Sequence, residues 1–214
     1  MSTAEFDSGT ELGRIDAGTS VLLTGDDEAV LSDLFYRLAA AGESERSVVL
    51  ATDSRGRTVT REFDGVTDGA GQRTTVLAAE GRASDGVATV DDVGDLTAVG
   101  MELSSLVREA RTDADRLRVG LFLCSSLCAA AEDTRSVYRF LNSNFLSTLR
   151  RAEAVGVCAL DTSADIGANV DSVVSGLETS FGARLDVVDY DATTATVEVT
   201  GLPGVDDTVT VSRT

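Results

Sequence analysis

The chain has 214 residues, of which 36 are acidic and 18 are basic, and its formal net charge is −18. Every basic residue is arginine, and lysine, histidine and tryptophan are absent. This balance argues against nucleic acid and anionic membranes as direct partners, because both attract clustered positive charge, and the lack of histidine excludes serine–histidine and cysteine–histidine catalytic pairs.

The first segment, residues 1–17, has no basic region followed by an apolar core, and we expect an N-terminal extension there rather than a secretory signal. Proline occurs once, at Pro203, and no linker-like stretch divides residues 18–214. We therefore expect these residues to form a single α/β domain. The longest mostly apolar run, Val119 to Ala131, is shorter than the roughly 20 residues of a membrane span. A cytoplasmic protein without membrane contact is expected.

Short runs rich in Val, Leu and Ile recur along the chain, separated by longer segments with helical periodicity. This alternation is typical of a mostly parallel sheet with crossover helices. The expected strands are Thr19–Gly25, Ser47–Asp53, Arg73–Glu80, Arg118–Ser126 and Val155–Asp161. Each run is apolar on both faces, as a buried sheet requires.

Four crossover helices are expected. The first follows Gly25 and stops at Gly42, a residue suited to a helix C-cap. The second starts at Asp95, a candidate N-cap, and the other two cover residues 134–154 and 169–180. The stretch from Ser54 to Gly71 is rich in Gly, Asp, Arg and Thr and fits either a short helix or a loop.

After Ala183 the pattern changes to alternating β-branched residues. The runs Ala183–Asp191, Thr194–Leu202 and Asp207–Thr214 are separated by turn residues. We expect residues 183–214 to form an antiparallel β-meander appended to the edge of the sheet.

The segment from Ser20 to Gly42 has the order of a phosphate-binding strand, loop and helix. A P-loop of the form G-x-x-x-x-G-K-[ST] uses glycine to converge backbone N–H groups on phosphate, lysine to reach the outer phosphates and a hydroxyl to bind magnesium. On that pattern Gly25 and Ser32 match the first glycine and the hydroxyl. Val30 replaces the second glycine and Leu31 replaces the lysine.

The loop residues Asp26, Asp27 and Glu28 would face a phosphate with like charge. At about 4 Å each such pair costs about 1 kcal/mol in water and about 4 kcal/mol at an effective dielectric of 20. The same acids are also typical of an ordinary helix N-terminus, where the helix dipole favours negative charge. The segment is interpreted as a degenerate P-loop.

A later strand of a nucleotide hydrolase ends in an aspartate that holds magnesium. Here the corresponding position is Cys124, and a thiol is a poor ligand for this hard cation. Cys124, Cys128 and Cys158 form no C-x-x-C pair and lie in apolar runs, so we expect buried small hydrophobic residues. We expect no cofactor, no metal site and no catalytic residues.

These segments carry a resemblance to a known family. The runs GTSVLLTGDD, VGLFLCSS, SVYRFLNSNFLSTLRRAEAVGVCALD and NVDSVVSGLETSFGARLDV resemble the RecA/KaiC-type ATPase fold. The chain is more closely similar to haloarchaeal KaiC-related proteins of unknown function that often lack intact nucleotide motifs. The likeness spans Gly18 to Asp189, and the acidic, arginine-only composition resembles that of cytoplasmic proteins from salt-loving archaea.

The resemblance implies a three-layer RecA-like sheet. In RecA/KaiC relatives the matched loop binds ATP, and the proteins assemble into rings or filaments. The departures at Val30, Leu31 and Cys124 prevent ATP hydrolysis from being carried over with the fold, which predicts a pseudo-ATPase.

Six other residues are candidates for ligand or partner contacts. Asp53, Arg55 and Arg57 follow the end of one strand and Asp161 that of another, and α/β sheets place ligands at such ends. Arg150 and Arg151 end a helix and resemble surface arginines that neighbouring subunits use in trans, although the helix dipole alone favours arginine there.

We therefore expect a non-catalytic regulatory or signalling module that acts through protein contacts. The expected partners are a second copy of the chain or an active KaiC-like relative. The alternative is a regulator that binds a nucleotide or another ligand at the carboxyl ends of the strands without a standard P-loop.

Overall fold

The computed structural model describes residues 5–213, except for the side chains of Asp53 and Glu80. The strands are β1 (Glu5–Asp7), β2 (Arg14–Asp16), β3 (Ser20–Gly25), β4 (Glu45–Arg55), β5 (Thr74–Glu80), β6 (Val87–Thr89), β7 (Arg116–Phe122), β8 (Val155–Asp161), β9 (Ala183–Tyr190), β10 (Thr194–Thr200) and β11 (Thr208–Ser212). The helices are α1 (Glu28–Ala39), α2 (Gly56–Val66), α3 (Leu96–Asp113), α4 (Cys124–Ala130), α5 (Thr134–Phe140), α6 (Leu146–Ala152) and α7 (Val170–Glu178). A 3-10 turn, η1 (Gly71–Arg73), and a π-helical turn, η2 (Leu141–Phe145), complete the elements.

The main sheet has the order β11-β10-β9-β3-β8-β7-β4-β5-β6. The pairs from β9 to β6 are all parallel, whereas β10 pairs antiparallel with both β9 and β11. The predicted class is therefore confirmed, a mostly parallel α/β sheet with a C-terminal antiparallel meander. β9 joins the two parts, because it pairs with β3 in parallel on its other side.

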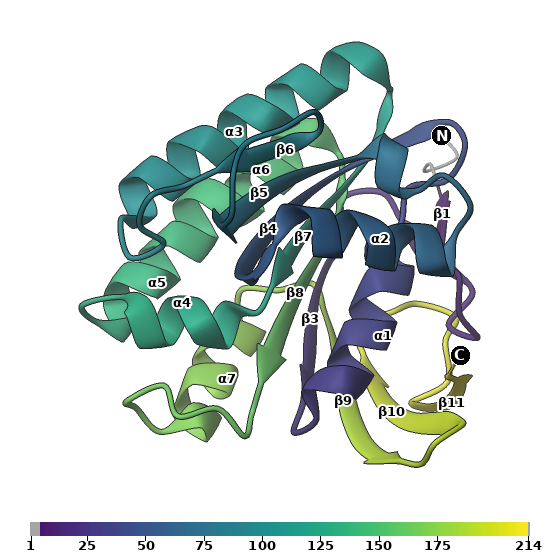
Figure 1. Cartoon of the computed structure of the whole chain (residues 1–214). Coiled ribbons are helices and arrows are strands. Elements are labelled where there is room, and N and C mark those ends of the chain that lie inside the picture. Colours follow the sequence, from purple (N-terminus) through teal and green to yellow (C-terminus); the bar gives the residue numbers. More distant parts are fainter. Residues whose placement is uncertain (1–4, 214) are drawn as a thin grey trace.

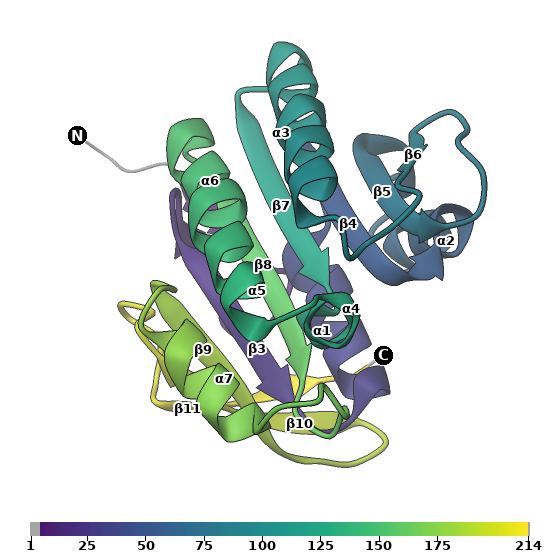
Figure 2. The same ribbon diagram turned by 90° about the vertical axis from the view of Figure 1, so that its left-hand side faces the viewer.

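Helices cover both faces of this sheet, so that the molecule has three layers (Figure 1). One face packs its apolar side chains against α1, α2 and the β1–β2 hairpin. The other face packs against α3 to α7, which lie together on the opposite side in Figure 2. Both faces of the central strands are buried, which explains why their sequences are apolar throughout.

Two predicted boundaries were wrong. The strand expected to reach Ser126 ends at Phe122, and α4 follows directly. The apolar run from Val119 to Ala131 covers a buried strand and then a buried helix, which the run itself does not separate. Helix α1 ends at Ala39 rather than at Gly42, whose N–H instead donates to Glu45 Oε2 at 3.1 Å.

The stretch left open between helix and loop contains a helix. α2 buries Val59 and Phe63, and η1 follows it. Asp95 caps α3 as predicted, because its carboxylate accepts from Ala98 N at 3.0 Å. The expected helix over residues 134–154 is continuous in space but passes through α5, the π turn η2 and α6.

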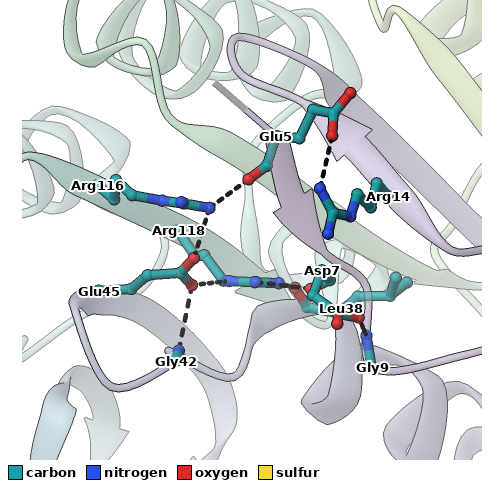
Figure 3. A network of polar contacts seen from close by, with 9 residues as sticks. All are labelled: Glu5, Asp7, Gly9, Arg14, Leu38, Gly42, Glu45, Arg116 and Arg118. Carbon is teal, nitrogen blue, oxygen red and sulfur yellow. Dashed lines mark hydrogen bonds and ion pairs between the residues drawn. The ribbon is translucent and has the colours of Figure 1, made fainter. Parts of the chain in front are cut away.

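The hairpin of β1 and β2 is tied to the main body by a polar network (Figure 3). Arg118 donates to the carbonyl of Asp7 at 2.7 Å and Arg116 donates to that of Glu5. Phe6 between them is buried, with the Arg116 guanidinium 4.5 Å from its ring centroid. Residues 5–16, expected as an extension, thus pack against the starts of β4 and β7.

Candidate functional site

The connection between β3 and α1 occupies the place of the phosphate-binding loop. β3 ends at Gly25 and α1 begins at Glu28, so only Asp26 and Asp27 lie between them. Asp27 is the helix N-cap, and its Oδ1 accepts from Val30 N at 3.0 Å.

This capping uses the backbone groups that a phosphate would need. The carbonyl of Asp27 accepts from Leu31 N at 3.0 Å, in addition to the bond from Val30 N to its carboxylate. The N–H groups at the positions of the second glycine and the lysine are therefore bonded inside the helix end. A phosphate cradle requires such N–H groups to converge on the ligand instead.

Apolar packing fills the space beneath this connection. A Cβ added at Gly25 would lie 3.1 Å from Val187 Cβ and 3.2 Å from Leu31 Cδ2. Leu31 and Val30 are both buried in the core, whereas Ser32 is half-buried. The residue at the lysine position thus points into the protein and not towards a ligand.

Tyr190 lies close to the two acids of this connection. β9 continues past the end of β3, because Thr24 pairs with Asp186 and the strand runs on to Tyr190. Partial desolvation, followed by the negative charges of Asp26 and Asp27, raises the pKa of Tyr190. The sequence pattern did not identify Tyr190, since its position depends on the register between β3 and β9.

The end of β7 carries no side-chain oxygen. Its last residue is Phe122, and Leu123 follows before α4 starts at Cys124. The neighbouring polar group is the hydroxyl of Thr52, which donates to Leu123 O at 2.8 Å and accepts from Leu123 N at 3.1 Å. The position where a magnesium-binding aspartate would be expected is thus apolar.

The three cysteines lie together behind this strand end. Cys124, Cys128 and Cys158 are free and buried, which confirms the expectation of small core residues. A hydrogen bond with Cys128 favours ionisation of Cys124, but the bond with Cys158 and burial outweigh it, so that the pKa of Cys124 is raised. The bond to Cys124 and burial also raise the pKa of Cys128. Among the described side chains, no group of three or more His, Cys, Asp or Glu is placed to hold a metal ion.

The other strand-end candidates are not brought together. Asp161 lies beside Gly25 in the register of β3 and β8, and its Oδ1 accepts from Ser163 N at 2.8 Å and from the Ser163 hydroxyl at 2.7 Å. Arg55 and Arg57 are exposed where β4 passes into α2. The backbone of Asp53 belongs to β4, and its side chain lies outside the described part.

Strand order explains this separation. Because β8 and β7 lie between β3 and β4, the ends of β3 and β4 are about 14 Å apart at the usual strand spacing. Arg150 and Arg151 lie near the amino-terminal ends of the strands, opposite to the ends that carry Gly25 and Asp161, since α6 leads into the start of β8. Arg151 lines a groove of about 300 Å³ between α3 and α6.

Within residues 5–213, no helix has the length and apolarity needed to cross a membrane.

Comparison with family models assigns most of the chain to one family. Residues 18–211 match the model of a family of unknown function, DUF7504. The chain belongs to the DUF7504 family. No curated protein is significantly similar to it.

The fold of this DUF7504 member has a counterpart among solved structures. The KaiC-like protein PH0186 from the hyperthermophilic archaeon Pyrococcus horikoshii OT3 matches with a TM-score of 0.65 and 16% sequence identity. The match covers 98% of this chain and 94% of that one. At this identity the likeness shows the fold alone, and it confirms the predicted RecA/KaiC-like architecture.

Proposed function

We propose that this DUF7504 protein is a non-catalytic regulatory or signalling module that acts through protein contacts. The observation that carries the proposal is the two-residue connection between β3 and α1. Both of its residues are acids, and Asp27 already bonds the N–H groups of Val30 and Leu31. The fold of an ATPase relative is kept, while the groups that would hold ATP are absent from this connection.

Electrostatics argues in the same direction. Asp26, Asp27 and Glu28 form the acidic start of α1. Each contact between such a carboxylate and a phosphate charge at about 4 Å costs about 1 to 4 kcal/mol, depending on the effective dielectric. Micromolar affinity corresponds to only about 8 kcal/mol, so several such contacts remove it. The phosphates of ATP therefore do not fit the residues at this edge.

Calorimetry tests the nucleotide part of the proposal. Wild-type protein in molar KCl is titrated with ATP and ADP in the presence of magnesium, and ATP turnover is measured in parallel. We expect no heat of binding and no turnover. A micromolar dissociation constant together with ATP hydrolysis would refute a non-catalytic module.

A charge-neutral variant separates the two physical causes. Asp26→Asn with Asp27→Asn removes both charges and keeps a side-chain oxygen at the cap position. If the variant also fails to bind ATP, the geometry of the connection excludes the nucleotide; if binding appears, charge was the cause. Loss of a measured affinity in Arg55→Ala or Arg57→Ala would favour the alternative, a ligand site built on arginine.

The protein-contact part needs its own experiment. Affinity capture from a native, high-salt extract, followed by mass spectrometry, identifies proteins that co-purify in stoichiometric amounts. We expect at least one such protein or self-association of the chain. A chain that remains alone and monomeric in both measurements contradicts this part of the proposal.

A further inference from the structure

β11 forms an open edge of the main sheet. It pairs with β10 on one side, and within residues 5–213 no strand pairs with its other side (Figure 1). The bond from Val199 N to Asp207 O shows that Asp207 faces β10. Because bonding alternates along an antiparallel pair, the backbone N–H and C=O groups of Thr208, Thr210 and Ser212 point away from β10.

Two side chains already cover the last of these three residues. Ser212 N donates to Glu11 Oε1 at 3.1 Å, and the carbonyl of Ser212 accepts from Arg37 at 2.7 Å. In the described part of the chain, no side chain covers the outward backbone groups of Thr208 and Thr210 in this way, and both residues are exposed. Such an unpaired edge is a ready template for another strand.

A groove of about 660 Å³ lies along this open edge. It is lined by Thr208, Val209 and Thr210 with the turn before them, and by the β1–β2 hairpin from Glu11 to Asp16. An extended segment of chain placed in the groove would continue the sheet at the ordinary spacing of about 4.8 Å between strands. This mode of recognition, in which a peptide adds to an exposed sheet edge, uses main-chain hydrogen bonds for affinity.

The groove carries negative charge. Its lining includes the acids Glu5, Glu11, Asp16 and Asp206 and one arginine, Arg14, which is paired with Glu5 at 2.9 Å. Among the described residues, no arginine lies within ion-pair distance of the other three acids. A segment that carries arginine or lysine is therefore attracted to the groove, and an acidic segment is repelled.

We propose that this groove binds an extended, positively charged segment of a partner protein, which adds to β11 as a further strand. Hydrogen bonds to the backbone of Thr208 and Thr210 hold the segment, and the carboxylates of Asp16 and Asp206 select basic side chains. The inference rests on the proposed function in taking the protein to act through protein contacts, and it names the surface and the chemistry of the partner.

A second copy of the chain is a poorer occupant of this edge. Because Ser212 is already covered, two β11 strands related by a twofold axis can bond all of their free outward groups only when Val209 lies opposite Val209. That register places Asp206 of each copy opposite Ser212 of the other, next to Glu11. Like charges then meet at both ends of the pairing, which is destabilising.

Titration with a strand-forming peptide tests the proposal. The probe is an acetylated and amidated peptide in which arginine alternates with threonine, and the reference peptide has glutamate at each arginine position. Calorimetry with the full chain is performed in low and in molar KCl. We expect the basic peptide to bind with a dissociation constant below about 1 mM, and more weakly in molar KCl because salt screens the charges. If neither peptide binds, or if both bind equally, the proposal is wrong.

A backbone variant identifies the edge that the peptide uses. Thr210→Pro removes an outward N–H and leaves the bonds from β11 to β10, whereas Thr210→Ala keeps the N–H. We expect proline to raise the dissociation constant about tenfold or more and alanine to change it less than about twofold, with circular dichroism showing that both variants fold.

Hydrogen exchange in the wild type gives an independent measure of the same edge. The amide protons of Thr208 and Thr210 should exchange at least about tenfold more slowly in the complex, because the added strand bonds them. Equal affinities of the two variants, or exchange that the peptide leaves unchanged, would overturn strand addition at β11.

Charge variants test the selection of basic segments. Asp16→Asn with Asp206→Asn should weaken binding of the basic peptide severalfold, while Glu109→Gln with Asp113→Asn on α3 changes the net charge equally and should not. Equal weakening by both pairs contradicts selection within the groove. A wild-type dimer that Thr210→Pro dissociates would place a second copy there and overturn the proposal. ATP turnover would instead refute the proposed function and leave this groove standing, so the two failures are distinguishable.

Discussion

Glu45 and Arg118 form a buried ion pair, with Glu45 Oε2 2.6 Å from Arg118 Nε and side-chain exposures of only 7% and 4%. The remaining donors of the Arg118 guanidinium bond the carbonyls of Leu38 at 2.8 Å and Asp7 at 2.7 Å. The other carboxylate oxygen of Glu45 lies 3.0 Å from Arg116 (Figure 3). This pair therefore joins β4 and β7 to the end of α1 and to β1.

Removing one partner of this pair should destabilise the protein strongly. Glu45→Ala leaves the Arg118 charge buried without its carboxylate, a change that typically costs about 3 to 5 kcal/mol of unfolding free energy. Urea denaturation in molar KCl measures the loss. The matched control is Glu5→Ala, whose side chain pairs with Arg14 at the surface, where an ion pair contributes less than about 1 kcal/mol. Equal losses in the two variants would contradict a structural role for the buried pair.

Restoring the missing lysine should not restore a nucleotide site. Leu31 is fully buried and its Cδ2 packs against Gly25, so Leu31→Lys removes core packing and buries an unpaired charge. We expect the free energy of unfolding to fall by at least the roughly 2 to 5 kcal/mol that a buried Leu→Ala substitution costs. We also expect no ATP binding by calorimetry.

The control for this substitution is Ser32→Ala, which changes the partly exposed neighbour and should stay within about 0.5 kcal/mol of wild type. A Leu31→Lys protein that keeps wild-type stability and binds ATP with magnesium would show that the connection still contains a usable phosphate site.

The central architecture was predictable because fully buried strands are apolar on both faces. The runs around Val21, Val49 and Val157 therefore identified β3, β4 and β8 directly. Where a buried helix follows a buried strand, as at Leu123, the apolar run continues and hides the boundary. Strands of three residues, such as β6 (Val87–Thr89), are too short to show an alternating pattern.

The candidate site was only half predictable. The sequence alone shows that Val30 and Leu31 replace the second glycine and the lysine of the P-loop pattern. The geometry that follows is not, because Asp27 bonds both N–H groups only once α1 starts immediately after it. Proximity across the sheet depends on strand order and register, which separate Arg55 from Gly25 and bring Tyr190 towards Asp27.

The hydroxyl of Thr52 should be required at the end of β7. It is buried and donates to the carbonyls of Phe122 at 3.1 Å and Leu123 at 2.8 Å, while accepting from Leu123 N. Thr52→Val keeps the shape but leaves a buried N–H without its acceptor, which costs about 1 to 3 kcal/mol. Thermal or urea unfolding measures the difference. Thr52→Ser retains the hydroxyl and should recover most of the stability; if Val and Ser variants behave alike, the hydroxyl is not the cause.

The turn between β9 and β10 should make the protein sensitive to acid. Asp191 Oδ1 accepts from Thr193 N at 2.7 Å, from Thr194 N at 2.8 Å and from the Thr193 hydroxyl at 2.9 Å. The backbone N–H groups of Thr193 and Thr194 are the largest causes that lower the pKa of Asp191, from an ordinary 3.8 to about 2. At pH values between about 2 and 3.8, the folded state therefore binds fewer protons than the unfolded state. The stabilisation is present above pH of about 4 and is lost as the pH falls through about 2.

Asp191→Asn separates this contribution from general acid effects. The amide oxygen still accepts from the backbone but has no carboxyl to protonate, so the loss of unfolding free energy between pH 4 and pH 2 should be smaller than in wild type. Urea titrations at several pH values across this window measure both slopes. Asp206→Asn removes one exposed acid from another turn and serves as the control for net charge. If wild type and Asp191→Asn lose stability equally between pH 4 and pH 2, the pKa of Asp191 does not differ between the folded and the unfolded chain, because only such a difference makes stability depend on pH. That result would contradict the prediction.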